Sequence, residues 1–143
     1  MNITREWLRE MNSCYSDERI AELIPEEGST LAEVLDLPIP ALDRVWVATR
    51  PGVLTYRQLV TFSQGCAARA RGYADFDSTT VIYADAAAYQ ATRTADAAYA
   101  YVDDYSAAAA SADYSAAAAA RSVDTARVER ETQVTHLKQL IAP

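Results

Sequence analysis

The segment 78–141 contains neither glycine nor proline and is rich in alanine. Alanine is the strongest helix former, so the whole segment is predicted to be helical. A single straight helix of roughly 60 residues would be about 90 Å long. A compact chain of 143 residues has a radius of gyration of only about 14–15 Å. The segment must therefore fold back on itself at least once.

Aspartate and serine mark where the segment is expected to break, because both favour helix caps over helix interiors. The sequence Val-Asp-Asp-Tyr-Ser at 102–106 combines the two, so we expect a break at Asp103 and Asp104. A second break near 122–125 is left open. Two or more long helices are predicted in place of one.

A helical wheel drawn over the segment as one helix sorts its large side chains into two stripes. The first stripe comprises Tyr83, Tyr101, Tyr105, Val123, Val134, Leu137 and Ile141. The second comprises Tyr89, Tyr99, Tyr114 and Val128, with Asp85, Asp96 and Asp103 close to it. We expect the first stripe to pack on the N-terminal helices and the second to face a binding partner. The alternative is that helix pairs bury the second stripe too, with its tyrosine hydroxyls reaching water.

Capping signals divide the first 74 residues into short helices. Asn2 or Thr4 can begin the first helix and Ser16, followed by two acids, the second. Pro25 ends that helix, and Thr-Leu-Ala-Glu at 30–33 matches a capping box. These signals predict three short helices before residue 40.

Three further signals concern residues 40–72. Pro40 is predicted to be the first residue of a helix that carries Leu42, Val45 and Trp46. Thr55 caps a helix that runs to about Arg71, with Gly72 as its C-cap. Val-Trp-Val at 45–47 favours a strand by propensity but has no obvious pairing partner.

Together these patterns predict an all-α fold. We expect a compact bundle of short N-terminal helices packed on two or more long Ala/Tyr/Asp-rich C-terminal helices. The chain is expected to be a single domain, 1–143, with a short-helix half (1–74) and an Ala-rich long-helix half (75–143).

The net charge of −7 is concentrated in the alanine-rich segment. Residues 1–74 carry ten acids and eight bases, whereas residues 75–124 carry eight aspartates and two arginines. This balance argues against direct nucleic-acid binding, which requires clustered Lys and Arg. Rows of acids on a helix instead suit a basic protein partner, whose approach they would accelerate.

No residue pattern typical of catalysis is recognisable. The single histidine, His136, has no metal-binding or triad partner at a suitable spacing. It lies near the end of the last predicted helix, where the helix dipole favours a cation. Cys66 is expected to be a buried helix cysteine. Asp103 and Asp104 would point about 100° apart on a helix and so do not converge on a metal. We expect no catalytic residues, no cofactor and no metal.

The sequence also bears on location. The N-terminus lacks the apolar stretch of a signal peptide, and no apolar run reaches the ~20 residues of a membrane span. Cys14 and Cys66 are not in a CxxC motif. We therefore expect a soluble cytoplasmic protein with reduced thiols and no membrane partner.

Several segments resemble those of a known family. They are Arg5-Glu-Trp-Leu-Arg, Cys14-Tyr, Trp46 before an arginine turn, Leu54-Thr-Tyr-Arg-Gln-Leu-Val-Thr-Phe62 with Cys66-Ala-Ala-Arg69, the Ala-aromatic-Asp repeats, and Gln133-Val-Thr-His-Leu-Lys-Gln-Leu-Ile141. In this order they resemble the Ala-rich helical immunity-protein family of bacteria and phages. The resemblance implies a protein of a bacterial cell, or one encoded by a phage, that neutralises a toxin by binding it. It supplies no active-site residues.

Three functions remain as hypotheses. The first is a non-enzymatic protein that neutralises a basic partner (a toxin, nuclease or defence effector) through an acidic helical face, as an immunity protein or a phage counter-defence inhibitor. The alternatives are a binder of a small ligand or nucleotide signal and a self-assembling structural protein, so a homo-oligomer stays open. The candidate partner-binding residues are Asp85, Tyr89, Asp96, Tyr99, Asp103, Asp104, Asp113 and Tyr114.

Overall fold

A computed structural model describes residues 1–73, 78–100, 105–119 and 123–143, with side chains except at 78, 80, 92, 95–100, 105–106 and 123–124. The described residues form eight helices and, apart from one isolated antiparallel bridge between Ile3 and Ser29, no β-structure. The helices are α1 (Arg5–Glu10), α2 (Asp17–Leu23), α3 (Leu31–Asp36), α4 (Ala41–Ala48), α5 (Tyr56–Tyr73), α6 (Ser78–Ala100), α7 (Tyr105–Ala118) and α8 (Val123–Ile141). The predicted all-α fold is confirmed.

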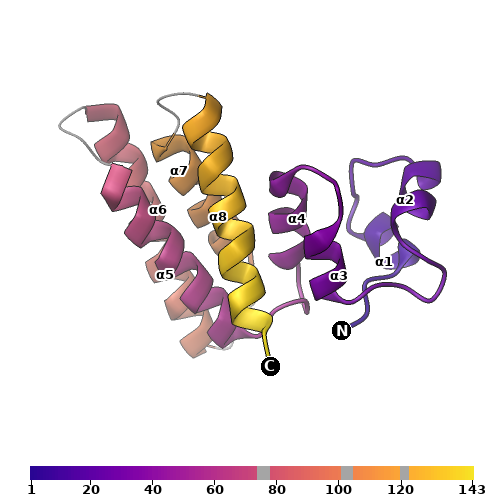
Figure 1. Ribbon diagram of the computed structural model, residues 1–143. Helices are drawn as coiled ribbons and strands as arrows, with labels where there is room; N and C mark the ends of the chain where they lie inside the picture. The colour runs from indigo at the N-terminus through magenta and orange to yellow at the C-terminus, as the bar shows by residue number, and fades with distance from the viewer. Residues whose placement is uncertain (74–77, 101–104, 120–122) are drawn as a thin grey trace.

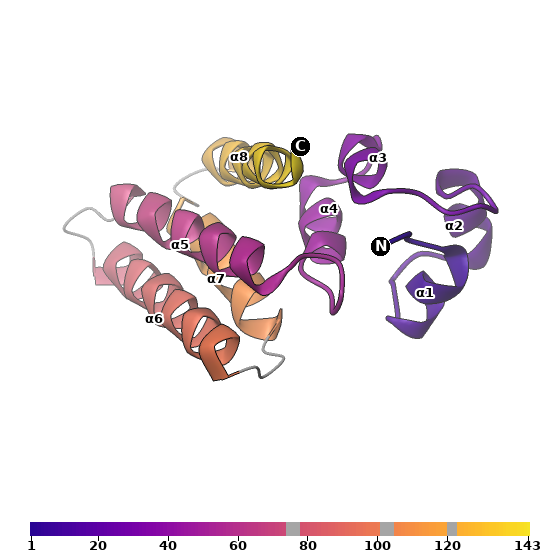
Figure 2. The ribbon, with the colours of Figure 1, turned by 90° about the horizontal axis from the view of Figure 1, so that it is seen from below.

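The long helices gather at one end of the molecule. Figure 1 shows α5, α6, α7 and α8 side by side, α1 and α2 at the far end, and α3 and α4 between them. In Figure 2, α6 and α8 lie on opposite sides of α5 and α7. Helix α6 packs against α5 and α7, whereas α8 also contacts α3 and α4. Helix α6 therefore forms an edge of the bundle, away from the short helices.

The predicted N-terminal caps are present. The Thr4 hydroxyl accepts a hydrogen bond from the backbone N–H of Trp7, and the Ser16 hydroxyl accepts one from Arg19. Thr30 and Glu33 form a reciprocal capping box. A cap of this kind satisfies backbone N–H groups that the first helical turn leaves free, so short helices can begin at these residues.

Two local predictions were wrong. Pro40 is the N-cap of α4, with an extended ψ of 140°, so the helix begins one residue later. Gly72 lies inside α5 and lacks the positive φ of a C-cap glycine. The predicted helix over Leu42, Val45 and Trp46 is confirmed, and the strand that 45–47 favour by propensity does not form, because Ala41, Val45 and Ala48 recur at helical spacing and are buried together.

The alanine-rich segment is divided among three helices, as the length of the chain requires. Helix α6 ends at Ala100 and α7 begins at Tyr105. The residues chosen for the break, Asp103 and Asp104, lie outside the described residues. Helix α7 ends at Ala118 and α8 begins at Val123, so the second break that the sequence left open is also present.

Two hydrophobic clusters hold the helices together. The larger joins the short helices to α5, α7 and α8 and includes Phe62, Leu59, Val134 and Leu137. The smaller lies where α5, α6 and α7 meet, and its buried members are all alanines: Ala67, Ala70, Ala84, Ala87, Ala91 and Ala118. Such small side chains allow helix backbones to approach closely, so the alanine contacts hold α6 against α5 and α7.

The single-wheel description of the segment was wrong. It assigned Tyr83 and Tyr114 to opposite stripes, yet their rings stack with centroids 6.4 Å apart. Because α6 and α7 pack on each other as separate helices, the wheel of one does not continue into the other.

Candidate functional site

Helix α6 buries one face and exposes the other. Ala84, Ala87, Ala91 and Thr94 recur at three- and four-residue spacing and are buried. Since a helix has 3.6 residues per turn, positions 82 and 89 lie together on the opposite face, about two turns apart. Ile82 is 63% and Tyr89 64% exposed there, the largest exposed fractions among the described large hydrophobic side chains.

An acidic side chain accompanies this apolar pair. Asp85 is exposed, lies between Ile82 and Tyr89 in sequence and is turned about 60° from Ile82. Val81, one residue before Ile82, is 40% exposed. We call Ile82, Asp85 and Tyr89 the outer face of α6; the exposed side chain of Arg93, four residues after Tyr89, lies beside them on the same side of the helix. Of the predicted partner-binding residues, Asp85 and Tyr89 belong to it.

The other predicted partner-binding residues divide into two groups. Asp113 is exposed on α7 but is paired with Arg130 of α8, at 2.7 Å. Tyr114 is half-buried in the alanine-lined cluster, where it stacks on Tyr83. These two residues therefore contribute to helix packing. The remaining side chains lie outside the described part of the structure: Asp96, Tyr99, Asp103 and Asp104.

A buried carboxylate joins α5, α7 and α8, and sequence reasoning did not identify it. Glu129 is fully buried. Its Oε1 accepts hydrogen bonds from Arg69 Nε at 3.0 Å, Ser115 Oγ at 2.7 Å and Gln133 Nε2 at 3.1 Å. Its Oε2 accepts one from the Tyr73 hydroxyl at 3.0 Å. The network satisfies the charge, which is the condition for burying it.

The pattern that could have revealed this network is short. Glu129, Gln133 and Leu137 are spaced four residues apart, so they lie along one face of α8 that ends in a buried leucine. The partner residues on α5 and α7 are 14 to 60 positions away in sequence, and only the packed bundle brings them together.

Two of the residues considered for chemistry, Cys66 and His136, are held in the bundle. Cys66 is fully buried, as predicted, and burial raises the pKa of its thiol to about 12. His136 packs its ring near Phe62, with centroids 5.8 Å apart, and its Nδ1 is shielded from solvent. Burial, followed by the charge of Arg69, lowers the pKa of His136. The expectation of a favoured cation at this position was therefore wrong.

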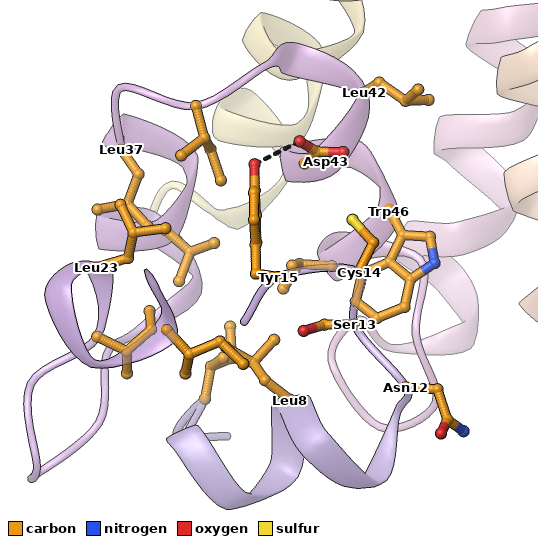
Figure 3. A pocket seen from close by; sticks show the side chains of 16 residues that line it. Leu8, Asn12, Ser13, Cys14, Tyr15, Leu23, Leu37, Leu42, Asp43 and Trp46 are labelled. Atoms are coloured by element: carbon orange, nitrogen blue, oxygen red, sulfur yellow. Dashed lines mark hydrogen bonds between the residues drawn. The ribbon is translucent and has the colours of Figure 1, made fainter. Parts of the chain in front are cut away.

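A cavity of about 240 Å³ lies among α1, α2, α4 and the segments that connect them. Most of its lining is aliphatic, and Leu8, Leu23 and Leu37 contribute to it. Figure 3 shows Tyr15 within this set of side chains, its hydroxyl directed at Asp43. The Tyr15 hydroxyl donates a hydrogen bond of 2.6 Å to Asp43 Oδ2. Sequence reasoning missed this site because its polar pair is separated by 28 residues.

Two polar groups of the cavity are energetically unusual. Burial, followed by the hydrogen bond to Asp43 and the charge of that carboxylate, raises the pKa of Tyr15 to about 12. The Ser13 hydroxyl oxygen is shielded from solvent and has no hydrogen-bond partner among the described residues. An unsatisfied buried hydroxyl costs about 1–3 kcal/mol, so the Ser13 hydroxyl would gain from a polar group placed beside it.

Across the described ranges, no group of three or more His, Cys, Asp or Glu side chains is arranged to hold a metal ion. Within the same ranges, none of the helices is both long enough and apolar enough to cross a membrane. No protein-family model, curated protein or solved structure matches this chain.

Proposed function

We propose that the protein is a non-enzymatic binding protein that occupies a basic protein partner through the outer face of α6. One observation carries this proposal: Ile82 and Tyr89 are each more than 60% exposed on the same face of one helix, next to Asp85. Clustered exposed apolar side chains are typical of interaction sites, and tyrosine is enriched among the residues that dominate binding energy.

The construction of α6 supports the choice of this face. Among the described side chains, its opposite side buries Ala84, Ala87, Ala91 and Thr94 where α6 packs on α5 and α7, so the helix is anchored without using Ile82 or Tyr89. An anchored helix loses little conformational entropy when a partner binds it. The apolar pair would supply affinity, and Asp85 would select a partner surface that carries Lys or Arg.

Charge supports a basic partner. The chain carries −7 overall, and residues 75–124, which include α6 and α7, contribute eight aspartates against two arginines. An acidic protein associates faster with a basic one, and salt weakens this steering. Together with the resemblance to immunity proteins, this favours a partner that itself binds anions, such as a nuclease toxin or a nucleic-acid-binding defence effector.

The test is capture of partners by immobilised variants from a lysate of cells that encode the chain. Ile82→Ser combined with Tyr89→Ser should remove the proteins that the native chain retains, and Asp85→Lys should remove those retained only at low salt. Val128→Ser is the matched control, because Val128 is 56% exposed on α8. Circular dichroism checks that the variants remain helical.

Two results would contradict the proposal. One is retention of the same basic proteins by the native chain and by the Ile82→Ser, Tyr89→Ser variant. The other is light scattering that shows a dimer for the native chain and a monomer for the double variant, because the outer face of α6 would then join two copies of the chain.

A further inference from the structure

The cavity among α1, α2 and α4 has the composition of a small-molecule site. Its volume of about 240 Å³ is about one and a half times that of an engineered apolar cavity that binds benzene. Drug-sized ligands usually occupy about 300–1,000 Å³. The cavity therefore suits one ring with a short substituent or one medium-length alkyl chain.

The polar groups of the cavity define the head of such a ligand. Asp43 Oδ2 already accepts a hydrogen bond from Tyr15, whereas Oδ1 can still accept one from a ligand. The shielded Ser13 hydroxyl supplies a second group without a partner among the described residues. Figure 3 shows the Ser13 hydroxyl turned toward the middle of the lining side chains. A hydroxyl or an ammonium can donate to Asp43, but a carboxylate cannot.

The charge around the cavity points to the same head group. Residues 1–36, which supply much of its wall, contain nine acids and three arginines, an excess of six negative charges. All nine acidic side chains are exposed. Two of the arginines are already paired, Arg9 with Asp17 and Arg19 with Glu22. An anionic ligand would be repelled both at the surface and by Asp43.

From these observations we infer that the cavity binds a small amphiphile with one apolar chain or ring and a neutral or cationic hydrogen-bond-donating head, a hydroxyl or an amine. The tail lies against Leu8, Leu23 and Leu37, and the head donates to Asp43. This site is separate from the outer face of α6, since α6 contacts α5 and α7 but none of the helices that line the cavity.

Cys14 offers a direct reporter of occupancy. It lines the cavity and is exposed, whereas Cys66 is fully buried. The neutral reagent iodoacetamide should therefore alkylate Cys14 and spare Cys66, which mass spectrometry can check. Trp46, which also lines the cavity, gives an independent fluorescence signal in a Trp7→Phe background.

The experiment compares n-octanol, n-octylamine and octanoate, which share one chain length and differ in the head. At about ten times the dissociation constant, a ligand leaves about one tenth of the sites free, so alkylation of Cys14 should slow about tenfold. We expect this protection, with a matching change in Trp46 fluorescence, from n-octanol and n-octylamine but not from octanoate.

Two variants assign the site. Asp43→Asn should weaken n-octylamine binding about tenfold or more, whereas Asp36→Asn, which changes an exposed acid on α3, should leave it unchanged. Leu23→Phe fills the cavity and should abolish protection by all three compounds. If that variant misfolds, Asp43→Asn and the ligand series still decide.

Three results would overturn the inference. Neither protection of Cys14 nor a change in Trp46 fluorescence with any of the compounds would mean that the cavity is only a packing void. Equal protection by octanoate and n-octylamine would mean that Asp43 does not select the head. Protection of Cys14 that grows with protein concentration in the absence of ligand would mean that a second copy of the chain covers the cavity.

Discussion

At the scale of single residues, Glu129 shows how a polar side chain can fix the position of three helices. The carboxylate is fully buried and receives hydrogen bonds from Arg69 and Tyr73 of α5, Ser115 of α7 and Gln133 of α8. Because each donor has a defined place on its helix, the network is satisfied only in one relative arrangement of α5, α7 and α8. Alanine-lined contacts alone would specify that arrangement less sharply.

Removal of this carboxylate should therefore be costly. Glu129→Ala leaves the Arg69 guanidinium, whose side chain is 23% exposed, without its counter-charge. Breaking a buried pair from one side costs about 3–5 kcal/mol. Glu22→Ala, which breaks the exposed pair with Arg19, should cost about 0.5 kcal/mol or less. Urea denaturation measures both, and similar losses for the two variants would argue against the network.

Tyr15 makes the free energy of unfolding depend on pH in the alkaline range, in a direction that its pKa fixes. Its pKa is raised from 10.0 to about 12 in the folded state, so the unfolded chain releases this proton first. The stabilisation is complete below pH 10 and is lost as the pH rises through about 12. The stability difference between the native chain and Tyr15→Phe should be constant below pH 10 and shrink above it.

This difference can be measured by urea denaturation at a series of pH values. Tyr73 and Cys66, whose pKa values are also raised, are present in both proteins, so their contributions cancel. A difference that does not change between pH 9 and pH 12 would show that Tyr15 is neither buried nor hydrogen-bonded to Asp43 in solution.

At the scale of helices, most start signals were predictable, whereas the end signals were right at Pro25 and wrong at Gly72. Thr4, Ser16 and Thr30 cap their helices because the contacts lie within three residues, which a sequence displays directly. Gly72 was misread as a C-cap because α5 continues to Tyr73, whose hydroxyl reaches Glu129 across the bundle.

The contact between α5 and α8 contains a glycine that has a packing role. A Cβ at Gly65 would lie 2.4 Å from Cε1 and 2.8 Å from Nδ1 of His136. Overpacking of this kind costs about 1–3 kcal/mol, whereas alanine is favoured over glycine by about 1 kcal/mol inside a helix. Whether Gly65→Ala stabilises or destabilises the protein should thus depend on whether the side chain at position 136 is large.

We expect Gly65→Ala to destabilise the native chain and to stabilise the His136→Ala variant. Denaturation of the four proteins in this cycle measures the coupling directly. The same change in stability in both backgrounds would mean that His136 swings away from Gly65 at no cost.

At the scale of the whole molecule, charge is arranged differently from what a division at residue 74 suggested. Residues 1–36 carry six excess negative charges, and residues 37–74 carry one acid and five arginines. The ten acids and eight bases of residues 1–74 are the sum of an acidic segment and a basic one. Helix α5, with three of those arginines, belongs with the long helices because it packs on α6 and α7.

The candidate site was predictable only in part. The helical wheel placed Asp85 and Tyr89 on one exposed face because both residues lie within α6, and the periodicity that the wheel assumes holds inside a single helix. Tyr114 packs against Tyr83 because the chain turns back between them, and the wheel contained no information about that turn. The residues that line the cavity come from separate segments between Ile3 and Val47, so no local sequence pattern predicts it.

The most direct measurement of the proposed function is photo-crosslinking from single positions. Benzoylphenylalanine placed at position 89 should form a covalent adduct with a basic protein in the lysate of cells that encode the chain. The yield should fall as salt is raised, because Asp85 and the acidic segment steer the encounter. The same group at position 128, on the exposed part of α8, should give no such adduct. Equal adducts from both positions, or a basic partner captured from position 128 alone, would contradict a binding site on the outer face of α6.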